Sequence, residues 1–146
     1  MTIDRAQQSI ESAFRNPQLM EAALALAEDR LSDAEPLLRA HLKQAPTDVA
    51  AIRLMAELAA RIGRLKDSEA LLRRALELAP SFGAARANLA TVLYKQNRFA
   101  DAVVELDAVL AAGGDNPAQE SLKAAALGRI GGYDEAVGLY KQLTER

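Results

Sequence analysis

Apolar residues recur along the chain at the spacing of one helix face, and short polar stretches separate these stripes. Leu54, Leu58 and Ile62 belong to one stripe, and Leu72 and Ala79 belong to the next. The pattern predicts helices of roughly 12 residues joined by short turns.

The chain also repeats itself every 34 residues without a gap. Six columns carry the repeat: Ala22, Ala56, Ala90 and Ala124; Ala34, Ser68, Ala102 and Ala136; Leu31, Leu65, Phe99 and Tyr133; Leu38, Leu72, Leu106 and Tyr140; Asp29, Gly63, Asn97 and Gly131; and Pro46, Pro80 and Gly114.

Each column suggests a structural role. The small residues allow two antiparallel helices to approach closely, and the large apolar residues fill the space between neighbouring pairs. The column of Asp, Gly and Asn holds residue types that tolerate a positive φ, so we expect it to end the first helix of each unit. The column of Pro and Gly ends the second helix. Pro36 is expected in the first turn of its helix, where Ser32 and Glu35 have the spacing of a capping box.

These signals divide the chain into a helix over 1–14 and four helix-turn-helix units over 15–48, 49–82, 83–116 and 117–146. One hairpin cannot bury its own apolar face, whereas stacked hairpins can. The last unit ends without a capping helix, so Val137, Tyr140 and Leu143 are expected to form an exposed end that promotes self-association.

Composition narrows the possible functions. Eighteen basic and 20 acidic residues nearly balance, which disfavours a nucleic-acid binder. The absence of cysteine and the single histidine exclude disulfides and sites built from several Cys or His ligands. No apolar run is long enough to span a membrane and no signal peptide is visible, so a cytoplasmic protein without cofactor or metal is expected.

The columns resemble the tetratricopeptide repeat (TPR). Residues 75–80 look like the typical end of such a repeat, and residues 94–102 and 131–136 look like its turn between helices. The resemblance implies an all-α, right-handed superhelix (a solenoid) of about four repeats that serves as a non-catalytic protein-interaction scaffold. Polar residues replace the usual large apolar ones at Glu21 and Lys123, in the first and last units.

Two runs, 53–59 and 122–131, resemble bacterial proteins in which these repeats precede a sulfotransferase domain. That resemblance implies a scaffold belonging to a larger enzyme, because the chain contains no Gly/Ser/Lys-rich phosphate loop of its own. The alternative is a free-standing adaptor, similar to a co-chaperone, that binds a partner peptide.

In this fold the first helix of each unit lines a concave groove. The expected lining is apolar in the first unit, at Leu19, Met20, Ala23 and Leu26. In the later units the candidate peptide-binding residues are Arg53, Glu57, Arg61, Asn88, Thr91, Tyr94, Lys95, Ser121 and Arg129.

Arg61, Lys95 and Arg129 lie 34 residues apart and would form a basic ladder suited to an acidic or C-terminal peptide. They would equally suit a solvated helix end, where a cation interacts favourably with the helix dipole. A carboxylate clamp for chaperone tails is disfavoured, since only Asn88 and, loosely, Arg53 match it. His41 shares a column with Ala75 and Val109 and is expected in a helix-packing seam.

Overall fold

The computed structural model describes residues 16–113, 116–131 and 133–144. The helix expected over 1–14 lies outside these residues. The described residues form eight helices and no strand: α2 (Pro17–Ala27), α3 (Leu31–Gln44), α4 (Val49–Arg61), α5 (Leu65–Leu78), α6 (Gly83–Lys95), α7 (Phe99–Ala111), α8 (Pro117–Arg129) and α9 (Tyr133–Thr144). The predicted all-α fold class is confirmed.

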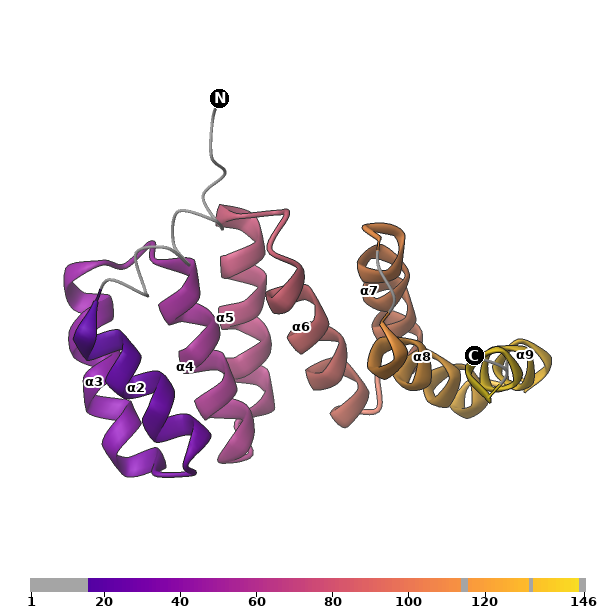
Figure 1. Cartoon of the computed structure of the whole chain (residues 1–146), viewed down its shortest axis with the longest axis horizontal. Coiled ribbons are helices and arrows are strands. Elements are labelled where there is room, and N and C mark those ends of the chain that lie inside the picture. Colours follow the sequence, from indigo (N-terminus) through magenta and orange to yellow (C-terminus); the bar gives the residue numbers. More distant parts are fainter. Residues whose placement is uncertain (1–15, 114–115, 132, 145–146) are drawn as a thin grey trace. The chain divides into compact units, whose positions relative to one another are not determined.

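The chain divides into two compact units, Met1–Ala85 and Arg86–Arg146. In the first, α2 pairs with α3 and α4 pairs with α5, as Figure 1 shows. Helix α4 also packs against α3, and Leu54 and Leu58 of α4 join Leu26 and Leu38 in one hydrophobic core. Each hairpin therefore buries its apolar face against the next.

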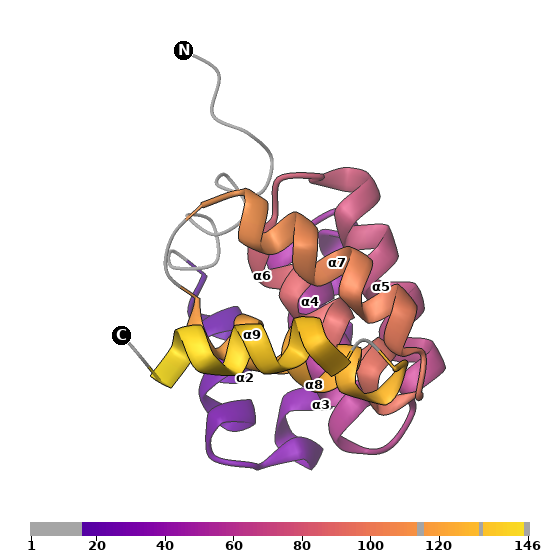
Figure 2. The ribbon, with the colours of Figure 1, turned by 90° about the vertical axis from the view of Figure 1, so that its right-hand side faces the viewer.

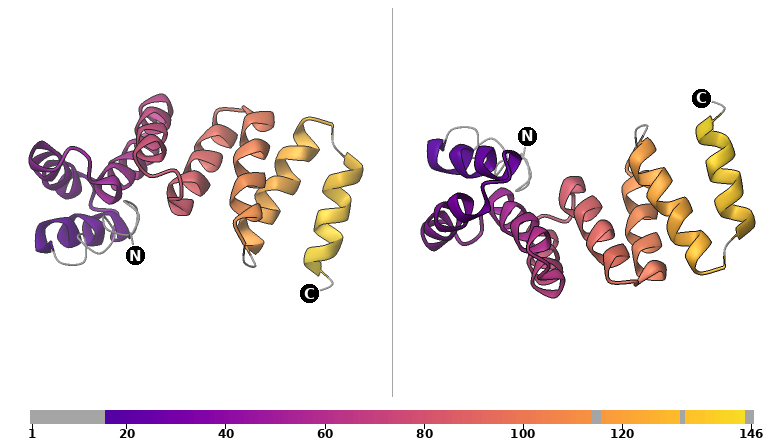
Figure 3. Two further views of the ribbon diagram at one scale, coloured as in Figure 1. Left: turned by 90° about the horizontal axis from the view of Figure 1, so that it is seen from above. Right: turned by 90° about the horizontal axis from the view of Figure 1, so that it is seen from below.

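In the second unit, α7 packs against α8 and α8 against α9; Figure 2 views this unit with α9 towards the reader. Arg86 on α6 donates to Glu105 on α7 at 2.8 Å, which links these two helices. Figure 3 follows the series from α7 to α9 from two further sides. Ala124 and Leu127 of α8 form a small apolar core in the second unit, and Leu139 of α9 packs against them.

The turn between the helices of each pair is the most regular feature of the chain. Asp29, Gly63, Asn97 and Gly131 have φ of 60°, 85°, 63° and 87°, which confirms the predicted left-handed column. In three of these turns the next residue, an arginine, donates its backbone N–H back to the first helix: Arg30 to Ala25, Arg64 to Ala59 and Arg98 to Leu93.

The same arginines stabilise the start of the second helix through their side chains. Arg30, Arg64 and Arg98 contact Asp33, Asp67 and Asp101 at 3.0, 2.7 and 3.0 Å, three residues further along the chain. Two side-chain hydrogen bonds raise the pKa of Arg30 above its ordinary value. The bond to Asp33 has the larger effect and the bond to Glu28 the smaller one. These exposed pairs add little stability singly, but they recur in step with the turn.

The small columns are buried where the two helices of a pair approach. Ala22, Ala34, Ala56, Ala102 and Ala124 are all fully buried. Ser68 takes the place of alanine in the second repeat, and its hydroxyl donates to the Ala56 carbonyl at 2.7 Å. The buried hydroxyl of Ser68 therefore has a hydrogen-bond partner, and the two helices still approach each other closely. The side chain of Ala136 lies outside the described residues.

The expected start of α3 was wrong. The helix begins at Leu31, directly after the left-handed turn, with Arg30 as its N-cap residue. Pro36 consequently lies inside the helix rather than in its first turn, and Ser32 is not a cap. The tight turn at Asp29 brings the chain into the helix earlier than the capping signal suggested.

Two Gly→Ala substitutions test the conformational role of the turn. A Cβ at Gly63 or at Gly128 would meet no atom within 4 Å, so neither substitution causes a clash. Gly63→Ala should lower the free energy of unfolding by about 1–2 kcal/mol, because alanine is strained at positive φ. Gly128→Ala, on helix α8, should raise it by about 0.5–1 kcal/mol. Chemical denaturation measures both, and equal effects would contradict the role assigned to the turn.

Candidate functional site

The apolar groove residues expected on the first helix separate into two groups. Leu19 and Leu26 are buried in the core of the first unit and do not line a surface. Met20 is half exposed, and Ala23 is partly buried against the core. The helical spacing of these residues was recognised correctly, but it did not distinguish the buried side of α2 from its open side.

In the first unit, the predicted groove cation Arg61 is engaged by the protein itself. Its guanidinium donates to the backbone carbonyl of Leu26 and contacts Glu57 at 3.0 Å and Asp29 at 3.7 Å. Arg61 thus satisfies a carbonyl at the end of α2 and is neutralised by two carboxylates. The other candidate on α4, Arg53, is partly buried.

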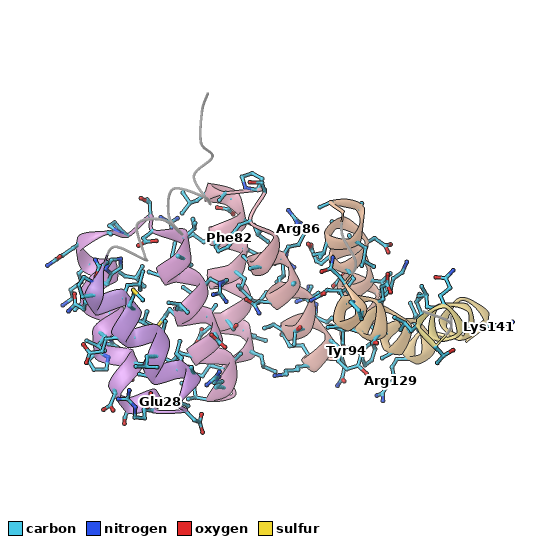
Figure 4. All side chains as sticks on the ribbon, in the orientation of Figure 1. Glu28, Phe82, Arg86, Tyr94, Arg129 and Lys141 are labelled. Carbon is cyan, nitrogen blue, oxygen red and sulfur yellow. The ribbon has the colours of Figure 1, made fainter. Side chains whose placement is uncertain are left out.

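The second unit places its predicted residues differently. Tyr94, at the end of α6, packs edge-to-face on Phe99, at the start of α7, with ring centroids 5.1 Å apart. Arg129, at the end of α8, lies over the same Phe99 ring at 5.0 Å. Tyr94 and Arg129 lie at the same end of this unit (Figure 4). Lys95 follows Tyr94 and is exposed. We call Tyr94, Lys95, Phe99 and Arg129 the basic–aromatic surface.

Phe99 was not among the predicted site residues, because its column had been assigned to packing between helices. It does pack there, yet it also supports the guanidinium of Arg129. In that column the first two units have Leu31 and Leu65, whereas the third unit has Phe99. This change from leucine to an aromatic residue was the signal in the sequence that could have identified Phe99.

The acids that neutralise Arg61 have no counterparts along the ladder. Glu57 lies four residues before Arg61. The corresponding residues are Thr91 before Lys95 and Ala125 before Arg129, and neither is acidic. The column of Asp29 continues as Gly63 and Asn97. Among the side chains that the structure describes, neither Lys95 nor Arg129 forms an ion pair. Among the described side chains, the two later cations of this column thus differ from Arg61, which contacts Glu57 and Asp29.

The remaining candidates of this unit are less distinctive. Asn88 is partly buried, and Thr91 donates its hydroxyl to the Ala87 carbonyl at 3.2 Å. Ser121 is exposed. At the expected self-association end, Leu143 is partly buried, whereas the side chains of Val137 and Tyr140 lie outside the described residues.

His41 is buried, as its column suggested, and it belongs to a polar network that sequence reasoning missed. Its Nε2 lies 2.7 Å from Oδ2 of Asp48, and its Nδ1 lies 3.4 Å from Nδ2 of Asn16. Asn16 and Asp48 are the N-caps of α2 and α4, so the imidazole links two helix starts. Both cap residues were recognisable from their positions immediately before a helix.

The described residues contain no group of three His, Cys, Asp or Glu side chains that could hold a metal ion. None of the described helices is long and apolar enough to cross a membrane.

Solved structures share this fold. MamA from Desulfovibrio magneticus RS-1 is 17% identical with a TM-score of 0.77, over 99% of this chain and 77% of that one. YrrB, described as a TPR protein with an unusual peptide-binding site, is 19% identical with a TM-score of 0.78, over 96% and 75%. The O-GlcNAc transferase of Thermobaculum terrenum is 25% identical with a TM-score of 0.72, over 87% of this chain but 23% of that one. No curated protein sequence matches the chain.

The model of the tetratricopeptide repeat family matches residues 25–81 and 63–126. These two segments together extend over more than half of the chain. The chain therefore belongs to the tetratricopeptide repeat family.

Proposed function

We propose that the chain binds a carboxylate-bearing segment of a partner protein at the basic–aromatic surface. Membership of the tetratricopeptide repeat family implies a scaffold for protein–protein interactions. The observation that carries the finer proposal is that Lys95 and Arg129 form no ion pair with any described side chain, in contrast to the neutralised Arg61. The relative YrrB, described as having a peptide-binding site, supports a peptide as the form of the ligand.

The chemistry of the surface suits a carboxylate. The aromatic ring of Phe99 holds one face of the Arg129 guanidinium, which limits the conformational freedom lost on binding. Its N–H groups remain able to form charge-assisted hydrogen bonds. Lys95 adds a second positive charge, and Tyr94 adds an amphipathic contact next to it. A C-terminal carboxylate or an Asp/Glu side chain would satisfy these groups.

Matched peptides test the proposal directly. One synthetic peptide carries several Glu residues and a free C-terminus, a second has Gln at the same positions, and a third has Lys. Fluorescence polarisation should detect binding of the acidic peptide and weaker or no binding of the other two. Lys95→Gln and Arg129→Gln should each weaken binding of the acidic peptide roughly threefold to tenfold at low salt. The difference from the unsubstituted chain should shrink as salt rises, because salt screens the attraction that each variant has lost.

Lys66→Gln serves as the control variant, because Lys66 is an exposed lysine on α5 in the other unit. It should leave the affinity unchanged. Equal affinity for all three peptides, or equal losses in the control and in the two variants, would contradict the proposal.

Measurements of stability distinguish Arg61, which has partners within the protein, from Lys95. Arg61→Ala should lower the free energy of unfolding by about 1 kcal/mol, since it removes a bond to the Leu26 carbonyl and leaves Glu57 and Asp29 unpaired. Lys95→Ala should change it by less than about 0.5 kcal/mol. Thermal and urea unfolding monitored by circular dichroism measure both, and a larger loss for Lys95→Ala would assign it a structural role.

The setting of this activity is a further proposal. The runs 53–59 and 122–131 support an N-terminal scaffold of a larger bacterial, sulfotransferase-like protein in the cytoplasm. A free-standing adaptor is the alternative. Reading the gene beyond codon 146 distinguishes them: a frame that continues into a phosphate-binding loop supports the scaffold, and a stop codon supports the adaptor.

Self-association through Val137, Tyr140 and Leu143 would use a surface distinct from the peptide surface. Leu143→Asp should then shift sedimentation towards the monomer without changing peptide affinity. The triple variant Asn88→Ala, Tyr94→Ala, Lys95→Ala should abolish peptide binding without changing sedimentation. Loss of both properties in either variant would contradict two separate surfaces.

A further inference from the structure

Two arginines at equivalent positions of the repeat are held in different ways. Arg61 and Arg129 are the last residues of α4 and α8 and lie two repeat lengths apart. The Arg61 guanidinium donates to the carbonyl of Leu26 and contacts two carboxylates. The guanidinium carbon of Arg129 lies 5.0 Å from the centroid of the Phe99 ring, and Arg129 forms no hydrogen bond or ion pair with a described residue. One arginine therefore supports the fold, and the other lies on an aromatic ring.

The carbonyl that binds Arg61 has an equivalent in the second unit. Leu26 precedes Arg61 by one repeat length and one residue, and Tyr94 precedes Arg129 by the same separation. Each of these carbonyls also accepts a backbone N–H from three residues later, at 3.1 Å for Leu26 and 2.9 Å for Tyr94. The acceptor at the end of α2 is thus repeated at the end of α6, but Arg129 does not donate to it.

The two carboxylates beside Arg61 are not repeated around Arg129. The positions of Asp29 and Glu57 are taken by Asn97 and Ala125. These uncharged residues exert no charge–charge attraction on the guanidinium of Arg129. The equivalent carbonyl in the second unit consequently lacks the two acids that accompany the Leu26 carbonyl.

The residue on which Arg129 lies also differs between the units. Leu31 has the same position relative to Arg61 as Phe99 has relative to Arg129. The face of an aromatic ring attracts a guanidinium, whereas a leucine side chain has no such face. Tyr94 packs edge-to-face on the Phe99 ring, with planes inclined by 72°, and this contact helps to fix the ring.

We propose that Phe99 is a positioning residue that decides which of the two arrangements Arg129 adopts. Its ring holds the guanidinium away from the carbonyl of Tyr94 and leaves the N–H groups accessible to a ligand. With leucine at position 99, Arg129 would donate to that carbonyl, as Arg61 donates to Leu26. The consequence for peptide binding rests on the proposed function, whereas the position of Arg129 can be measured in the protein alone.

Two substitutions taken from the repeats of the chain test the proposal in the full chain. Phe99→Leu introduces the residue that the same column has at Leu31 and Leu65, and Phe99→Tyr introduces the residue that it has at Tyr133. Since the column already contains both residue types, both variants should fold, which circular dichroism checks.

NMR of the ligand-free protein gives the first readout. The ring current should shift the side-chain protons of Arg129 upfield in the unsubstituted chain and in Phe99→Tyr. Phe99→Leu should remove this shift and slow the exchange of the Arg129 guanidinium protons with water, because they are then hydrogen-bonded to a carbonyl. The signals of Arg61 are the internal control and should not change.

The acidic peptide gives the second readout. Phe99→Leu should weaken its binding as much as Arg129→Gln does, and Phe99→Tyr should retain it. In the Arg129→Gln background, Phe99→Leu should cause no further loss, because the residue through which it acts is already absent.

Arg129 signals that are unaffected by Phe99→Leu would overturn the proposal, and so would losses of affinity that add in the double variant. If the peptide binds Phe99→Leu as well as it binds the unsubstituted chain, the positioning role fails and the proposed function stands. If the unsubstituted chain does not bind the peptide, the proposed function fails and the NMR signals still decide the role of Phe99.

Discussion

The left-handed residue between the helices of each pair is the constraint on which the rest of the structure depends. It ends one helix and allows the next to begin two residues later, as at Asp29 and Leu31. So short a reversal places the two helices antiparallel and close together, which in turn requires the small residues of the buried columns. A wider turn would separate the helices and leave the hydroxyl of Ser68 too far from the Ala56 carbonyl to donate to it. The repeat length, the pairing and the composition of the interface follow from one backbone conformation.

Much of this fold could be predicted from the sequence because the repeat units of the chain can be aligned with one another. Four residues in one column, all of types that tolerate positive φ, identify the turn better than any one of them alone. The predictions that failed concerned positions where local signals compete. Ser32 and Glu35 form a plausible capping box, but the turn at Asp29 had already started the helix. Leu19 and Met20 are neighbours with similar hydrophobicity, and only tertiary packing decides which of them is buried.

The candidate site was only partly predictable, for a different reason. A column shows that Arg61, Lys95 and Arg129 occupy equivalent positions, but it does not show which of them have partners. The partners of Arg61 lie in other columns and include a backbone carbonyl, which no sequence pattern displays. When several columns are compared together, the acidic partners of Arg61 are seen to be replaced by uncharged residues in the later repeats. Functional differences in a repeat protein arise at these departures, since the shared positions maintain the fold.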